Sequence, residues 1–158
     1  MAATRVNGAG AMKPNPLVGA WRLVTYEAHA GDEVTYPLGE DASGFIMYTP
    51  DGYMSVLIMA AGRTNFASDD ILGGTDEEKL EAARTFLSYC GRYEFLGDRV
   101  VHKIETASYP NRVGTEQTRF IQLEGDELLL TTPPMVIHGT SRSGRLRWER
   151  AAPRARSV

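Results

Sequence analysis

Between Trp21 and Arg150 the sequence is a nearly continuous series of short strand-like segments. Apolar and polar residues alternate in most of these segments, and turn-forming Gly, Asp and Pro residues separate them. A chain made almost wholly of strands has to cover its open sheet edges, and closing the sheet into a barrel does so. We therefore predict an all-β fold, a closed antiparallel up-and-down β-barrel of about eight to ten strands with one inserted α-helix.

The strand candidates follow one another in near-sequential order, which favours the up-and-down topology. They are residues 21–27, 34–37, 44–49, 53–59, 92–96, 100–107, 117–124, 127–132 and 137–150, the last range supplying one or two strands.

The inserted helix is predicted from a capping box at Thr75 to Glu78, with acidic residues in the first turn. The apolar residues that follow at helical spacing are Leu80, Ala83, Phe86, Leu87 and Cys90, and Gly91 ends the run. This stripe predicts that the helix packs against the sheet or plugs the mouth of the barrel.

The length of 158 residues, with 42% hydrophobic and 23% charged residues, fits one soluble globular domain. We assign the barrel to residues 17–151, a disordered segment to residues 1–16 and a basic tail to residues 152–158. The net charge of −3 gives no reason to expect nucleic acid, and no apolar run is long enough to span a bilayer. The lone Cys90 and the absence of a secretory signal indicate a cytoplasmic protein, and the sequence leaves a homodimer open.

Four blocks of the sequence resemble the bacterial lipocalin-like domain proteins, and they occur in the same order. The blocks are residues 16–27 (PLVGAWRLVTYE), 44–56 (GFIMYTPDGYMSV), 109–115 (YPNRVGT) and 130–134 (LTTPP). The resemblance implies a calycin-type barrel around a hydrophobic cavity. It also implies that Trp21, in its Gly-x-Trp motif, closes the base of the barrel beneath an arginine of the last strand. Arg147 or Arg150 could supply that arginine, and we assign Arg147.

Alternation predicts which polar side chains face the interior. In residues 100–106, Lys103 and Glu105 belong in water, which turns His102 inward. An inward histidine could act as an acid or base near neutral pH. The alternative is a structural histidine, hydrogen-bonded to a neighbouring strand.

Two further ionisable side chains are predicted to face inward. If Trp21 points into the barrel, strict alternation places Glu27 inside as well, where burial would raise the pKa of its carboxyl group. At an open mouth Glu27 would simply be solvated. Arg119 shares a face with Ile121 and Leu123, so it could hold a carboxylate, enolate or phenolate of a ligand, or neutralise Glu27.

The predicted site combines these groups with a tyrosine and apolar walls. The candidate catalytic residues are Glu27, His102, Arg119 and Tyr48, and the candidate ligand-binding residues are Leu23, Thr25, Tyr53, Leu57, Met59, Ile104 and Phe86. The three histidines are scattered without the spacing of a metal cluster, so we expect neither a metal nor a cofactor.

The expected partner is a hydrophobic small molecule, and two functions compete. Barrels of the resembled kind also occur as cofactor-free cyclases and isomerases of natural-product pathways, which implies cyclisation or isomerisation of a polyketide-type substrate. We prefer this enzyme because buried ionisable groups are costly in a mere apolar container. The alternatives are a non-catalytic binding, carrier or sequestration protein, and a packed barrel that serves only as an interaction module.

Overall fold

The computed structural model describes residues 14–152, and these form ten strands, one α-helix and one 3₁₀ helix. The elements are β1 (Gly19–Ala30), β2 (Glu33–Thr35), β3 (Ser43–Tyr48), β4 (Tyr53–Met59), α1 (Asp76–Arg84), β5 (Phe86–Phe95), β6 (Arg99–Ala107), η1 (Pro110–Arg112), β7 (Glu116–Glu124), β8 (Glu127–Thr131), β9 (Met135–Ile137) and β10 (Thr140–Arg150).

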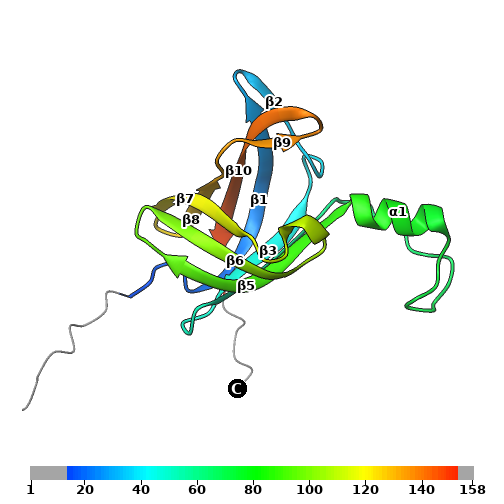
Figure 1. Cartoon of the computed structure of the whole chain (residues 1–158), viewed down its shortest axis with the longest axis horizontal. Coiled ribbons are helices and arrows are strands. Elements are labelled where there is room, and N and C mark those ends of the chain that lie inside the picture. The colour runs from blue at the N-terminus through cyan, green and yellow to red at the C-terminus, as the bar shows by residue number, and fades with distance from the viewer. Residues whose placement is uncertain (1–13, 153–158) are drawn as a thin grey trace, which may run out of the picture.

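Eight strands close the predicted antiparallel barrel, which is confirmed (Figure 1). The order around it is β1-β3-β4-β5-β6-β7-β8-β10, and β10 pairs back onto β1. The short strands β2 and β9 pair with β1 and β10 and extend the sheet beyond the barrel. Closure leaves each of the eight strands with two neighbours, so backbone groups are bonded without an exposed edge.

The side chains of β4 alternate strictly between the interior of the barrel and its outer surface. Met54, Val56 and Ile58 are buried, whereas Leu57 and Met59 keep 42% and 43% of their surface exposed. The sequence is apolar on both faces here, so it carries no local signal that Leu57 and Met59 lie outside. Their predicted place in the ligand site was wrong.

Strand β1 does not keep its alternation. Leu23 pairs with Trp148 and Thr25 with Arg147 on β10, so Val24 is an extra residue in a β-bulge. The bulge shifts every later side chain to the opposite face. Tyr26 consequently turns inward, and Glu27 turns outward.

The helix begins at the predicted capping box but ends sooner than expected. Thr75 caps α1 reciprocally with Glu78, and the helix stops at Arg84. The helix buries no residue, and it projects from the barrel (Figure 1). The predicted packing of this helix on the sheet was therefore wrong. Residues 86–90 belong to β5, where pairing with β4 and β6 satisfies the backbone on both sides.

The base of the barrel is closed by Trp21, whose Nε1 donates to the carbonyl of Leu17 at 2.9 Å. The guanidinium carbon of Arg150 lies 4.1 Å from the centre of the indole ring. Arg147 is exposed on the outer face, so its assignment as the covering arginine was wrong. Arg150 lies two residues from the buried Trp148 and shares its face of β10, whereas Arg147 has the opposite parity.

The predicted disordered segment and basic tail lie almost wholly outside the described residues. Asn15 is described, and it is not loose: its side chain bonds to the Tyr93 hydroxyl and to the backbone N–H of Leu17. Among residues 14–152, α1 is too short and too polar to cross a membrane, and no other helix there could do so.

Candidate functional site

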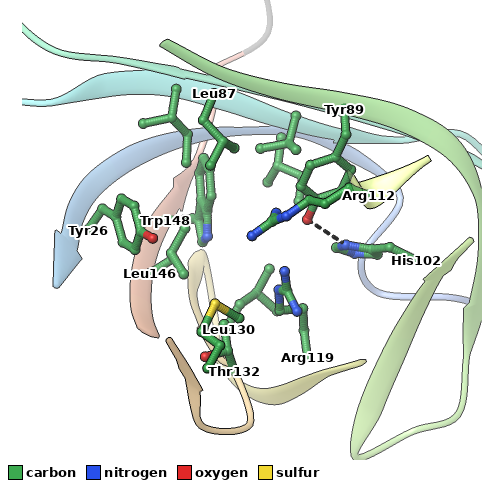
Figure 2. A pocket seen from close by; sticks show the side chains of 14 residues that line it. Tyr26, Leu87, Tyr89, His102, Arg112, Arg119, Leu130, Thr132, Leu146 and Trp148 are labelled. Atoms are coloured by element: carbon green, nitrogen blue, oxygen red, sulfur yellow. Dashed lines mark hydrogen bonds between the residues drawn. The ribbon is translucent and has the colours of Figure 1, made fainter. Parts of the chain in front are cut away.

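The interior of the barrel contains a cavity of about 440 Å³, part of which opens to solvent (Figure 2). Its walls are mainly apolar and come from strands all around the barrel. The apolar lining includes Ile46, Val56, Ile58, Leu87, Leu130 and Leu146. Side chains crowd this space so closely that the centre of a water-sized sphere fits in only about 30 Å³ of it. An organic ligand can therefore enter only if lining side chains move apart.

His102 lies inside the barrel and is fully buried between two tyrosines. Its Nε2 is 2.9 Å from the hydroxyl of Tyr48, and its Nδ1 is 2.9 Å from the hydroxyl of Tyr89. Burial holds the pKa of His102 well below 6.5, and the nearby charges of Arg119 and Arg112 lower it further. The imidazole is therefore neutral at neutral pH, with one nitrogen that donates and one that accepts.

The tyrosines beside His102 are also buried. Burial raises the pKa of Tyr48 well above 10, so its hydroxyl keeps its proton. The ring of Tyr48 packs edge-on against Tyr93, with centroids 4.9 Å apart. Tyr48 and His102, both predicted site residues, thus lie in direct contact, and Tyr89 completes a tyrosine–histidine–tyrosine chain of hydrogen bonds.

Two arginines bring positive charge into the cavity, and Figure 2 shows both side chains pointing into it. Arg119 of β7 is 5% exposed, and its Nη1 donates to the carbonyl of Thr118 at 2.8 Å. Arg112 extends from η1, with its guanidinium carbon 5.5 Å from the centre of the Tyr89 ring. Within residues 14–152, neither arginine makes an ion pair, and no carboxylate lines the cavity. The cavity is consequently electropositive.

Arg112, Tyr89 and Trp148 line the cavity but were absent from the predicted site. Arg112 follows a strand in an irregular loop, where alternation predicts no direction. Backbone bonds between Ile104 and the loop residues Gly114 and Thr115 hold that loop against β6. A repeat of two starting at Leu87 turns Tyr89 inward, whereas the helical spacing predicted for these residues hides that direction.

The remaining predicted residues do not reach the cavity. Glu27 lies in a groove on the outside of the barrel with the exposed Arg145 and Arg147, and its Oε2 is 2.7 Å from Nε2 of His29. It cannot act on a ligand inside, because the bulge at Val24 turned it outward. Leu23 and Ile104 are buried core residues, and Thr25 is half-buried next to the bulge. Two others are on the outer surface: Tyr53 is exposed, and Phe86 is half-buried beneath Arg63.

The family model of the lipocalin-like domain matches residues 18–151, and the chain belongs to this family. A 4'-hydroxy-3'-methoxypropiophenone carrier protein, ppsC of Aspergillus oryzae, is 39% identical over 106 residues, which cover 61% of this chain and 96% of the relative. Two solved structures also align with the chain. An uncharacterized protein from Bacteroides eggerthii has a TM-score of 0.45 at 15% identity, covering 84% of this chain and 98% of its own. A point mutant of the fluorescent protein UnaG has a TM-score of 0.37 at 12% identity, covering 85% of this chain and 95% of its own.

Proposed function

We propose that this protein binds an apolar small molecule inside the barrel and carries it unchanged. The observation that carries this proposal is the state of His102. Both of its ring nitrogens are engaged by tyrosine hydroxyls, and no carboxylate among the described residues lines the cavity. The site therefore offers contacts and hydrogen bonds but no free base that could take a proton from a ligand.

Family membership and the carrier relative support small-molecule binding. The relative's name specifies an aromatic ketone with a phenolic hydroxyl group, a molecule with one flat apolar face and several polar oxygens. The cavity described here offers apolar walls with a few polar groups, which is the usual composition of a site for such a ligand. 4'-Hydroxy-3'-methoxypropiophenone is therefore the first probe to test.

Entry of this probe requires the cavity to widen. Met135 and Leu87 line it, and Met135 belongs to the short outer strand β9. Methionine side chains adapt their shape at low cost. We expect these residues to move apart on binding while the eight barrel strands stay paired.

Calorimetric titration with the probe tests the proposal, followed by mass-resolved chromatography of the recovered compound. We expect binding of about one probe per chain and recovery of the same compound. Ile58→Phe adds a ring to the cavity wall and should weaken binding about tenfold or more. Leu57→Phe is the matched control, because the neighbouring side chain points outward. Both variants should keep the circular dichroism spectrum of the parent.

Two results would overturn the carrier function. Catalytic conversion to a product of unchanged mass would instead support the cofactor-free cyclase or isomerase, which stays a prediction. No binding of the probe, or equal weakening by Ile58→Phe and Leu57→Phe, would remove the cavity as the binding site for this class of ligand.

A further inference from the structure

We infer that the cavity holds its ligand as an oxyanion, an ionised phenol, enol or carboxyl group, placed between Arg112 and Arg119. This inference rests on the proposed function, because it names the chemical form of the molecule that the barrel binds. The charges and hydrogen-bond donors that line the cavity favour such a group (Figure 2).

The formal charge on the residues that line the cavity is wholly positive. The titratable groups that line it are Tyr26 on β1, Tyr89 on β5, His102 on β6, Arg112 on η1 and Arg119 on β7. The other lining residues, from β3, β4, β5, β8, β9 and β10 and the loop after β8, carry no charge. Two guanidinium groups thus share an apolar space without a compensating anion among the described residues. Arg119 is buried and Arg112 is half-buried. Because an uncompensated buried charge is costly, an anionic ligand would relieve a penalty that the free protein bears.

Guanidinium groups suit this task. Each presents several N–H donors in one plane, which match the lone pairs of a phenolate oxygen or the two oxygens of a carboxylate. Arg119 uses one Nη1 hydrogen bond on the carbonyl of Thr118, and its other donors have no hydrogen-bond partner within residues 14–152. These donors are free to bind the ligand.

The hydrogen-bond chain through His102 supplies a further donor. The hydroxyl of Tyr48 is buried, and its one hydrogen-bond partner among the described residues is Nε2 of His102. If Nε2 carried the proton, the Tyr48 O–H would be a buried donor without an acceptor, which costs about 1–3 kcal/mol. Tyr48 therefore donates to Nε2, and Nδ1–H donates to Tyr89. The O–H of Tyr89 is then free to donate into the cavity.

A fourth donor lines the cavity from β10. The indole Nε1 of Trp148 is buried, and it has no hydrogen-bond partner among the described residues. The whole residue is only 1% exposed, so water cannot readily replace that partner. Buried donors are nearly always satisfied in folded proteins, so an orphan in a cavity wall points to a missing acceptor. An oxygen-bearing ligand supplies that acceptor. Arg112, Arg119, Tyr89 and Trp148 together select for acceptors and against donors.

An absorbance titration tests the ionised state directly. The probes are 4'-hydroxy-3'-methoxypropiophenone and its 4'-O-methyl ether, which cannot ionise. A hydroxyphenyl ketone absorbs at longer wavelength once its phenol loses the proton. The buffer is set about one pH unit below the pKa of the free phenol, measured under the same conditions, so that most of the free probe is neutral. We expect the long-wavelength band to appear when wild-type protein is added, and the methyl ether to bind about tenfold more weakly.

Variants then locate the positive charge. Arg112→Gln and Arg119→Gln keep hydrogen-bonding groups but lose the charge, and each should diminish the band and lower affinity for the phenol about tenfold. Arg99→Gln is the matched control, because the exposed Arg99 of β6 pairs only with its neighbour Asp98 within the described residues. The wild-type spectrum decides the ionised state even if a variant fails to fold.

The two proposals fail in different ways. If both probes bind equally well and no band appears, the oxyanion inference is overturned while the carrier function stands. If the band appears but survives in both glutamine variants, Arg112 and Arg119 do not hold the anion, and the inference is overturned in that form. If neither probe binds, the carrier function fails for this class of ligand and the inference fails with it.

Discussion

The environment of His102 inside the barrel determines its protonation state. Its ring is buried, both nitrogens are bonded to tyrosine hydroxyls, and two guanidinium groups line the same cavity. A further positive charge beside Arg112 and Arg119 would be repelled as well as poorly solvated. The histidine therefore serves as a neutral connector between Tyr48 and Tyr89, and its tautomer sets which of the two hydroxyls donates to it.

This neutrality predicts a pH dependence of stability. Burial places the pKa of folded His102 well below the 6.5 of an ordinary histidine. Above pH 6.5 the residue is neutral in both states and its contribution is complete. Below that pH the unfolded chain gains a proton that the folded chain does not. The free energy of unfolding should then fall, by up to about 1.4 kcal/mol per pH unit for this one group.

Urea unfolding at pH values of about 7.5, 6.5 and 5.5 measures this slope. His102→Gln is the matched variant, because an amide can bond to both tyrosines but does not titrate. We expect a shallower loss of stability in the variant over the acidic half of this range. Identical slopes in the two proteins would show that His102 accepts a proton in the folded state.

Tyr48 should influence ligand binding although it does not line the cavity. In Tyr48→Phe, Nε2 of His102 loses the donor that holds the ring proton on Nδ1, so part of the population can take its proton on Nε2 and accept from Tyr89 at Nδ1. The Tyr89 hydroxyl would then turn from the ligand, and affinity for the phenolic probe should fall about fivefold. ¹⁵N chemical shifts of His102 report the change of tautomer independently of affinity. Tyr93→Phe, in contact with Tyr48 but not bonded to His102, should leave both readouts unchanged; a wild-type His102 that carries its proton on Nε2 would contradict the assignment.

At the level of elements, the succession of short strand-like segments predicted the barrel, and alternation predicted the buried face of β6. It failed where a partner strand decides the outcome. The bulge at Val24 arises from pairing with β10, and nothing in residues 21–27 marks it. Residues 86–90 are apolar at positions that fit both a helix and a strand, and the choice falls to β5 because β4 and β6 lie on either side of it.

The site was predictable to the same extent. His102, Arg119 and Tyr48 lie on regular strands, so a repeat of two places them inside. Glu27 follows the bulge, so the same repeat gives it the wrong face. Arg112 lies in η1, and its position depends on how the loop folds back onto β6. The local sequence therefore predicts the cavity residues that lie on regular strands. It fails for residues that follow a bulge or lie in a loop.

The close pairing of β5 with β6 predicts that a side chain at Gly91 destabilises the fold. Gly91 lies at a register shift between these strands, and a Cβ there would overlap the backbone of Lys103 and Glu105. Since backbone cannot yield as a side chain can, Gly91→Ala should destabilise the fold by about 3 kcal/mol. Gly125→Ala is the control: it has a φ of +59° and open space, so it should cost only about 1–2 kcal/mol. Denaturant unfolding of both variants compares the two costs, and equal values would show that the strands separate easily at Gly91.

At the scale of the molecule, closure brings the two ends of the barrel chain together at one base. Trp21 and Arg150 are register partners on β1 and β10, the pair of strands that completes the ring. Arg150 covers the indole and donates to the carbonyls of Pro16 and Val18, so it also holds the incoming chain against the base. The first and last strands are thus joined by side-chain contacts as well as by the ladder.

Removing this arginine should therefore weaken the whole barrel rather than one strand. Arg150→Met keeps much of the side-chain volume but loses the contact with the Trp21 ring and the two backbone carbonyls. We expect a loss of about 2 kcal/mol in the free energy of unfolding. Its exposed ion pair with Asp126 contributes little, because water screens such pairs. Arg147→Met, on the same strand but facing outward, should stay within about 0.5 kcal/mol of the parent. Denaturant unfolding measures both variants, and equal losses would mean that Arg150 acts only as a surface charge and that the ladder between β1 and β10 alone closes the barrel.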